Sequence, residues 1–112
     1  MEPRWELRPV GVVRSSVADP RAMPVGGVPA VVEIYPEFAP ALVDVESNTH
    51  LWVLAWLHDA DRGTLQTRGR HARPGGAQRG VFGLRHASRP NPIGLMAARL
   101  LRVEGRQVHL DR

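Results

Sequence analysis

A short motif, Arg89-Pro90-Asn91-Pro92-Ile93-Gly94, combines polar side chains with unusual backbone stiffness. Each proline fixes its own φ and disfavours helical backbone in the residue before it, so Arg89 and Asn91 are held in extended conformations. Gly94 then permits a turn or a close approach of the backbone. The motif therefore presents one guanidinium and one carboxamide at fixed positions, which suits the orientation of a ligand. A stiff loop that closes one end of a barrel is the alternative interpretation.

The basic charge of the chain is carried by arginine alone and is unevenly distributed. Among 112 residues there are 15 arginines and no lysine, and the formal net charge is +4. Residues 1–61 hold four arginines and nine acidic residues, whereas residues 62–103 hold nine arginines and no acidic residue. This second stretch predicts a face for an anionic partner such as RNA, because guanidinium groups bind phosphate in a bidentate manner. A solvated basic surface is the alternative.

Several common kinds of active site are not supported by the sequence. The chain has no cysteine, which excludes thiolate nucleophiles, disulfide bonds and cysteine-based metal sites. Its five histidines include no H-x-x-x-H pair, so we expect no metal. The serines lack a G-x-S-x-G elbow, and both the Walker loop and a G-x-G-x-x-G segment are missing. A Rossmann nucleotide-binding fold is therefore not expected.

Short apolar runs bounded by glycine, proline and polar residues predict the strands that must position these groups. Residues 39–47 form the one stretch that predicts a helix, with Leu42 and Val45 on the same face. The pattern predicts an all-β fold, a single small β-barrel with one short helix and no Rossmann domain. The predicted strands are Pro9–Arg14, Pro29–Ile34, Leu51–Leu57, Arg79–Leu84, Leu95–Val103 and Arg106–Leu110. By propensity, a helix over Leu95–Leu101 is the alternative.

Length and composition predict one domain over residues 1–112. No apolar run approaches the ~18–20 residues that a membrane helix needs. Residues 1–8 lack the apolar core of a secretory signal. We therefore expect a cytoplasmic protein that does not enter a membrane.

Taken together, these motifs resemble those of the TsaA-like family, whose characterised members are tRNA threonylcarbamoyladenosine methyltransferases. The hexapeptide Arg89–Gly94 is the most specific match. The matching segments are Val10–Ser15, Pro20-Arg21, Thr49–Leu54 with His58, Arg73-Pro74, Arg79–Phe82 with Arg85, and Arg89–Gly94. The resemblance implies a β-barrel methyltransferase that acts as a homodimer. It also implies that S-adenosylmethionine supplies the methyl group for the exocyclic nitrogen of threonylcarbamoyladenosine, next to the tRNA anticodon.

The resemblance implies roles for individual residues as well. The P-R-Q stretch of the family corresponds to Pro20-Arg21-Ala22 and its H-Q pair to His58-Asp59, so both glutamines are replaced. The implied cofactor contacts are Pro20, Arg21, Ala22, His58, Asp59, Arg85 and Leu95. His58 is also a candidate general base, because histidine titrates near neutral pH, and Asn91 is expected to orient the substrate with Arg89. The arginines expected to contact tRNA phosphates are Arg68, Arg70, Arg73, Arg79 and Arg89.

Members of this family continue beyond the last predicted strand into a D-G-T-P segment and a D-x-K-P-Y motif. This chain ends at Arg112, before those motifs, and we expect its domain to be C-terminally incomplete. Two other functions are compatible with the sequence. One is a paralogous enzyme that methylates a small molecule, and the other is a non-catalytic basic module that binds RNA.

Overall fold

The computed structural model describes residues 2–15, 28–68, 76–84 and 87–111. The chain forms two compact units. Unit 1 comprises Met1–Leu51 with Ala97–Arg112, and unit 2 comprises Trp52–Met96. No helix in the described part of the chain is long and apolar enough to cross a membrane. The assignment of residues 1–112 to a single domain stays a prediction.

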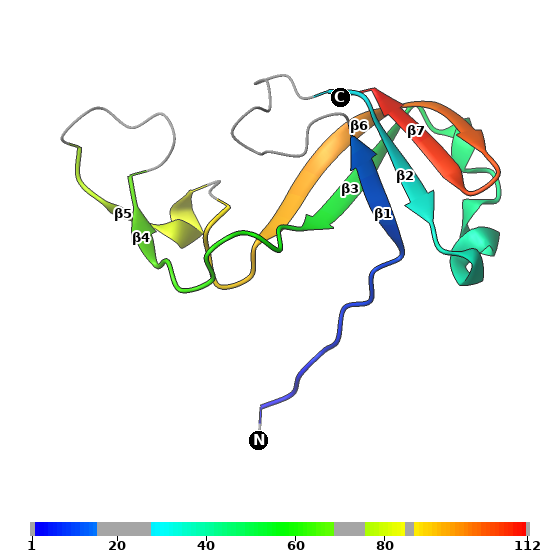
Figure 1. Cartoon of the computed structure of the whole chain (residues 1–112). Helices are drawn as coiled ribbons and strands as arrows, with labels where there is room; N and C mark the ends of the chain where they lie inside the picture. The colour runs from blue at the N-terminus through cyan, green and yellow to red at the C-terminus, as the bar shows by residue number, and fades with distance from the viewer. Residues whose placement is uncertain (1, 16–27, 69–75, 85–86, 112) are drawn as a thin grey trace. The chain divides into compact units, whose positions relative to one another are not determined.

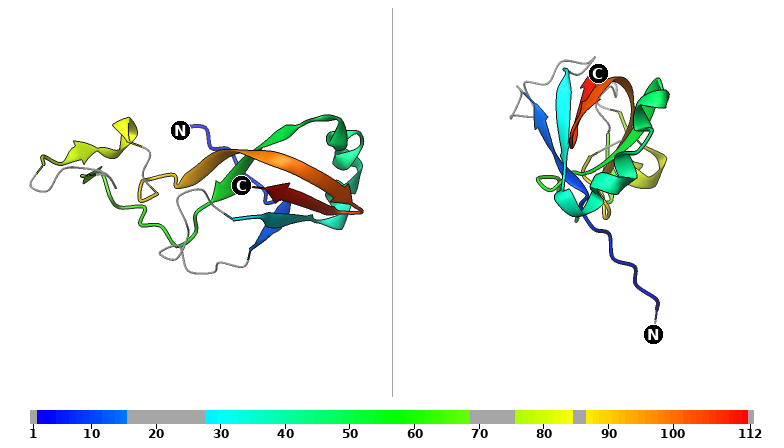
Figure 2. Two further views of the ribbon diagram at one scale, coloured as in Figure 1. Left: turned by 90° about the horizontal axis from the view of Figure 1, so that it is seen from above. Right: turned by 90° about the vertical axis from the view of Figure 1, so that its right-hand side faces the viewer.

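Strands make up most of the regular structure, which confirms the predicted all-β class (Figure 1). One sheet has five strands in the order β1-β2-β7-β6-β3, and a second sheet pairs β4 with β5. In unit 1, Figure 2 shows the strands twisting about one another, so that the sheet curls. The strands are β1 (Gly11–Ser15), β2 (Ala30–Ile34), β3 (His50–Trp56), β4 (Gln66–Thr67), β5 (Arg79–Gly80), β6 (Ile93–Glu104) and β7 (Gln107–Asp111).

The predicted strand over Arg79–Leu84 forms only at its first two residues. Only β5 pairs, and the chain then turns into a short 3-10 helix, η4 (Val81–Gly83), closed by a bond from Leu84 N to Val81 O. The physical reason lies in β4, which offers only two residues for pairing. The strand β4 itself was not predicted from the sequence.

The predicted helix over residues 39–47 is replaced by two shorter 3-10 helices, η2 (Pro36–Leu42) and η3 (Val45–Ser47). Pro40 lies inside η2 and has no N–H to donate. Asp44 then takes a left-handed conformation with a φ of 63°, which ends the helical path before η3 begins.

The core of unit 1 is built from alternate residues of β6 and β7. Val108 and Leu110 on β7 are buried, as is Ala98 on β6. Val108 is paired with Val32 on one side and Val103 on the other, which forms an apolar row across three strands. Full burial of a side chain such as Val108 contributes about 1.5–3 kcal/mol, and this row helps to hold β7 between β2 and β6.

Candidate functional site

In unit 2, the proline-rich motif is bonded to the end of β3. The backbone N–H of Leu57 donates to Pro92 O at 2.8 Å, and Pro92 is fully buried. Gly94 lies inside β6 and takes no left-handed conformation. A Cβ at Gly94 would lie 3.7 Å from Ala55 O and 3.4 Å from Leu57 Cδ2. Gly94 therefore lies beside β3 within a strand and makes no turn, and a Cβ there would meet ordinary van der Waals contacts.

The two polar residues of the motif have different surroundings. Arg89 is half-buried, and its Nη1 donates to Leu84 O at 3.2 Å. Asn91 is exposed, and its backbone carbonyl oxygen accepts a hydrogen bond from Ile93 N at 2.8 Å. The loop thus holds Arg89 by a structural bond and leaves the Asn91 carboxamide accessible to a ligand.

Arg62 fastens the motif from the outside, a role that the sequence did not reveal. Its Nε donates to Pro90 O at 2.8 Å. Its guanidinium carbon also lies 5.1 Å from the centre of the Trp56 ring, within the range of a cation–π contact. The Arg62 side chain therefore joins the end of β3 to Pro90, which lies 28 positions after Arg62 in the chain.

A tight turn centred on Asp61 directs Arg62 toward these partners. The Asp61 carboxylate accepts one bond from Gly63 N at 2.8 Å and another from Thr64 Oγ1 at 2.9 Å. These two bonds lower the pKa of Asp61, with the Gly63 N–H as the larger cause. The carboxylate is therefore ionised at neutral pH and maintains the turn.

His58 and Asp59 lie just beyond β3, after Leu57, and both side chains are 80% exposed. His58 Nε2 lies 3.5 Å from Asp59 Oδ2. The backbone around them is fixed, because His58 N donates to Trp56 O and Ala60 N donates to Leu57 O. Both side chains are consequently accessible at a defined place beyond the strand.

Leu95, the other described residue with a predicted cofactor role, lies on an exposed apolar face of unit 2. Gly94 packs on the side of Ala55 and Leu57, so its neighbours Ile93 and Leu95 lie on the opposite side of β6. Alternate residues of β3 share that side. We call this surface the β3–β6 apolar face, and its exposed residues are Trp52, Leu54, Trp56, Ile93 and Leu95.

Two of the predicted RNA-binding arginines lie together on the β4–β5 hairpin. Thr67 pairs with Arg79, and Arg68 follows Thr67, so both arginines lie at the same end of the ladder. Both residues are exposed. The other predicted site residues, Arg70, Arg73, Arg85, Pro20, Arg21 and Ala22, lie outside the described residues.

The sequence of the chain was compared with protein-family models and with known proteins. Residues 12–112 match the family model described as the tRNA-methyltransferase O N-terminal domain. A "Probable S-adenosyl-L-methionine-binding protein" of Methanothermobacter thermautotrophicus is 39% identical over 99 residues, which cover 85% of this chain and 70% of that protein. The "tRNA (adenine(37)-N6)-methyltransferase" of Homo sapiens is 36% identical over 71 residues, 63% of this chain and 16% of that protein.

Solved structures give the same result. "Crystal structure of TrmO" matches with a TM-score of 0.76 and 27% identity, and covers 99% of this chain and 49% of that one. "Crystal structure of TrmO from Pseudomonas aeruginosa" matches with a TM-score of 0.74 and 25% identity, and covers 97% of this chain and 49% of that one. This chain therefore spans about half the length of these two structures.

Proposed function

The chain belongs to the tRNA-methyltransferase O N-terminal domain family, and from this premise we propose that it takes part in S-adenosylmethionine-dependent methylation of tRNA. The supporting observation is that His58, Asp59, Asn91 and Leu95 are all accessible in unit 2. Relatives that are named as S-adenosyl-L-methionine-binding proteins support the same cofactor.

The described residues fit such a cofactor chemically. S-adenosylmethionine carries a planar aromatic base, an ammonium group and a carboxylate, and its sulfonium supplies an activated methyl group. We assign the exposed Leu95 to contact with the ring. The Asp59 carboxylate, which replaces the glutamine of the family, suits the ammonium group. His58 and the backbone beside it supply further hydrogen-bonding groups.

For the substrate, we propose the exocyclic nitrogen of threonylcarbamoyladenosine beside the anticodon. His58 is then the general base. With the proton on Nε2, which lies 3.5 Å from Asp59 Oδ2, Nδ1 carries the lone pair that accepts the proton lost by the target nitrogen. The exposed carboxamide of Asn91 hydrogen-bonds to the modified base and orients it.

The anionic RNA backbone is proposed to bind near the β4–β5 hairpin. Arg68 and Arg79 are exposed and adjacent there. Residues 62–103 contain no acidic residue, so no side chain of this stretch neutralises them. A tRNA substrate also favours a cytoplasmic location.

We propose that a second copy of the chain covers the β3–β6 apolar face. Large exposed apolar surfaces commonly mark interfaces between proteins. Leu95 belongs both to this face and to the predicted cofactor contacts, so a second copy seated there would lie beside the cofactor. Leu54→Arg should convert a dimer to a monomer in sedimentation equilibrium, and Val43→Arg, at a residue that is 80% exposed elsewhere, should not. An unchanged dimer in Leu54→Arg would exclude this face as the interface.

The proposed activity is tested by calorimetry with S-adenosylmethionine and by mass spectrometry of nucleosides from tRNA treated with the protein. Loss of a general base reduces turnover by about 10²–10⁴-fold, so His58→Gln should lower the rate to this extent while the cofactor still binds. His50→Gln is the matched control, because His50 is an exposed histidine at the start of β3. Wild-type protein that fails to bind S-adenosylmethionine would refute the proposal.

A further inference from the structure

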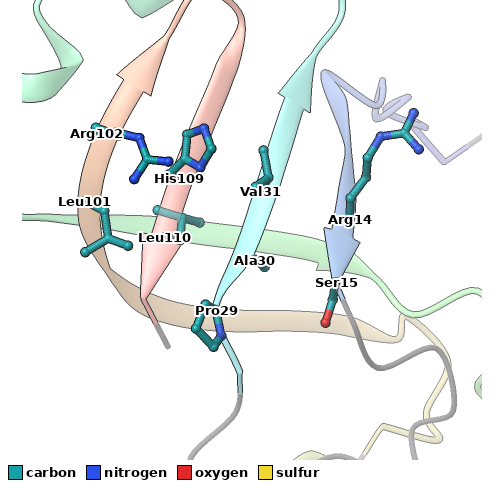
Figure 3. Close-up of a pocket in the computed structure, with 9 residues that line it drawn as sticks. All are labelled: Arg14, Ser15, Pro29, Ala30, Val31, Leu101, Arg102, His109 and Leu110. Carbon is teal, nitrogen blue, oxygen red and sulfur yellow. The ribbon is translucent and has the colours of Figure 1, made fainter.

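Unit 1 contains a groove that none of the predicted site residues line. Its volume is about 470 Å³, within the usual range of small-molecule sites. Most of the lining is apolar, and Figure 3 shows the residues on β1, β2, β7 and β6. The lining residues are Arg14, Ser15, Pro29, Ala30, Val31, Leu101, Arg102, His109 and Leu110.

The strand register places four of these residues in one row across the sheet. Arg14 is paired with Val31, Val31 with His109, and His109 with Arg102. An irregularity in the ladder between Leu100 and Arg102 adds Leu101 beside the row. An imidazole thus lies at the centre, between an aliphatic side chain and a guanidinium group (Figure 3).

Both guanidinium groups of the row already have carboxylate partners. Arg14 Nε donates to Glu33 Oε2 at 2.7 Å, and Arg102 Nε donates to Glu104 Oε1. The bond from Arg102, and then its charge, lower the pKa of Glu104, so this carboxylate stays ionised. Since the positive charges are compensated, the groove does not favour a small inorganic anion.

His109 is the unusual member of the row. Its side chain is only 16% exposed, and its Nε2 is buried with no hydrogen-bond partner among the described residues. The nearest carboxylate atom, Glu104 Oε2, is 3.8 Å away, which is too far for a hydrogen bond. A buried polar atom without a partner is costly, and a bound ligand can supply the missing bond.

These features define the ligand. An apolar groove with a single buried hydrogen-bonding atom suits a flat, uncharged ring that carries a polar edge. We propose that the groove binds a nucleobase of single-stranded RNA, which hydrogen-bonds to His109 Nε2 and packs against Val31 and Leu101. The choice of RNA as the source of the base rests on the proposed function.

The test is a titration of the chain, with ¹⁵N-labelled histidine, by each of the four nucleoside 5′-monophosphates at millimolar concentration. At least one of them should shift the Nε2 resonance of His109 and leave that of the exposed His50 unchanged. His109→Phe keeps an aromatic ring without the nitrogen, and should weaken binding by about 5-fold, the equivalent of one net hydrogen bond. Leu101→Trp fills the groove from a half-exposed position and should abolish binding, whereas His50→Phe is the matched control. A short single-stranded RNA should give the same shift at lower concentration.

Two results would overturn the inference. One is the absence of any shift of His109 with all four nucleotides. The other is a His109 shift by S-adenosylmethionine that competes with the nucleotide, because the groove would then hold the adenine of the cofactor. The proposed function is judged separately, since S-adenosylmethionine affinity in calorimetry should be the same in wild type, His109→Phe and Leu101→Trp. If the wild-type protein does not bind S-adenosylmethionine but nucleotides still shift the His109 resonance, only the methyltransferase proposal is refuted.

Discussion

Removal of the Arg62 guanidinium should loosen the proline-rich motif without unfolding the chain. Arg62→Ala eliminates the bond to Pro90 O at 2.8 Å and the contact with Trp56 at 5.1 Å. A hydrogen bond contributes about 0.5–1.5 kcal/mol net, and an exposed cation–π contact about 0.5–1 kcal/mol. Because the hydrogen bond between Leu57 and Pro92 still holds the loop, we expect Arg62→Ala to remove about 1–2 kcal/mol of the free energy that keeps the motif in place. This corresponds to a roughly 5- to 30-fold weaker affinity for S-adenosylmethionine.

Calorimetric titration with S-adenosylmethionine measures this effect, and three variants separate its causes. Arg62→Lys keeps the charge above Trp56 but loses the planar group, so it should recover part of the affinity. Trp56→Leu removes the ring, and a double-mutant cycle with Arg62→Ala isolates the cation–π share. Arg68→Ala is the matched control, because it removes an exposed arginine from the same basic stretch. If Arg62→Ala binds the cofactor within about 2-fold of wild type, well below the ~5-fold minimum expected here, Arg62 does not position the motif.

Three further predictions concern RNA, pH and backbone packing. Arg68→Ala and Arg79→Ala should each flatten the log–log salt dependence of tRNA binding by about 0.7–0.9, and an unchanged slope would remove that arginine from the phosphate contacts. The pKa of Asp61 is lower in the folded state, so its contribution to stability is present at neutral pH and is lost as the pH falls through the folded-state pKa. Asp61→Asn should therefore reduce the loss of thermal stability on acidification, and identical acid melting profiles would contradict this. A Cβ at Gly11 would lie 2.3 Å from the carbonyl oxygen of Glu33, so Gly11→Ala should destabilise the fold by about 1–3 kcal/mol in denaturant unfolding. Gly80→Ala, which has room for the new atom, should cost less, and equal losses would refute the clash.

The positions of most strands follow from local sequence. Runs of valine and aromatic residues between turn residues locate β1, β2, β3, β6 and β7, because each run is long enough to span a ladder. The R-G-V-F-G-L run has the same local character, yet its pairing stops at Gly80 because β4 is so short. The length of β5 is set by its partner strand, and this length cannot be predicted from the local sequence.

The residues of the candidate site also differ in how far the local sequence predicts them. The exposed position of His58 and Asp59 just beyond a strand is predictable from the end of the apolar run, and their roles, which the resemblance implies, stay a prediction. Arg62 could not be found in this way, because its role depends on Trp56 and Pro90, which are separated in sequence and brought together by β3 and β6. The burial of His109 also cannot be predicted from the local sequence, because it results from the register between β2, β7 and β6.

The sequence of β3 is more apolar than its surroundings in the described structure require. Leu51–Leu57 is apolar at every position, a pattern typical of strands buried on both faces. In the described structure the side chains of β3 alternate instead between half-buried and exposed, and Trp52 is 72% exposed. A strand with one solvent-exposed face normally alternates apolar and polar residues. We therefore propose that a partner surface covers the apolar residues on the open face. The dimer proposal rests on this reasoning, and it requires that Leu54→Arg, placed at the centre of the face, leave the thermal stability of the isolated chain nearly unchanged while association is lost. A large loss of stability in the monomeric state would show that the face is packed within the chain itself, and the second copy would then be unnecessary.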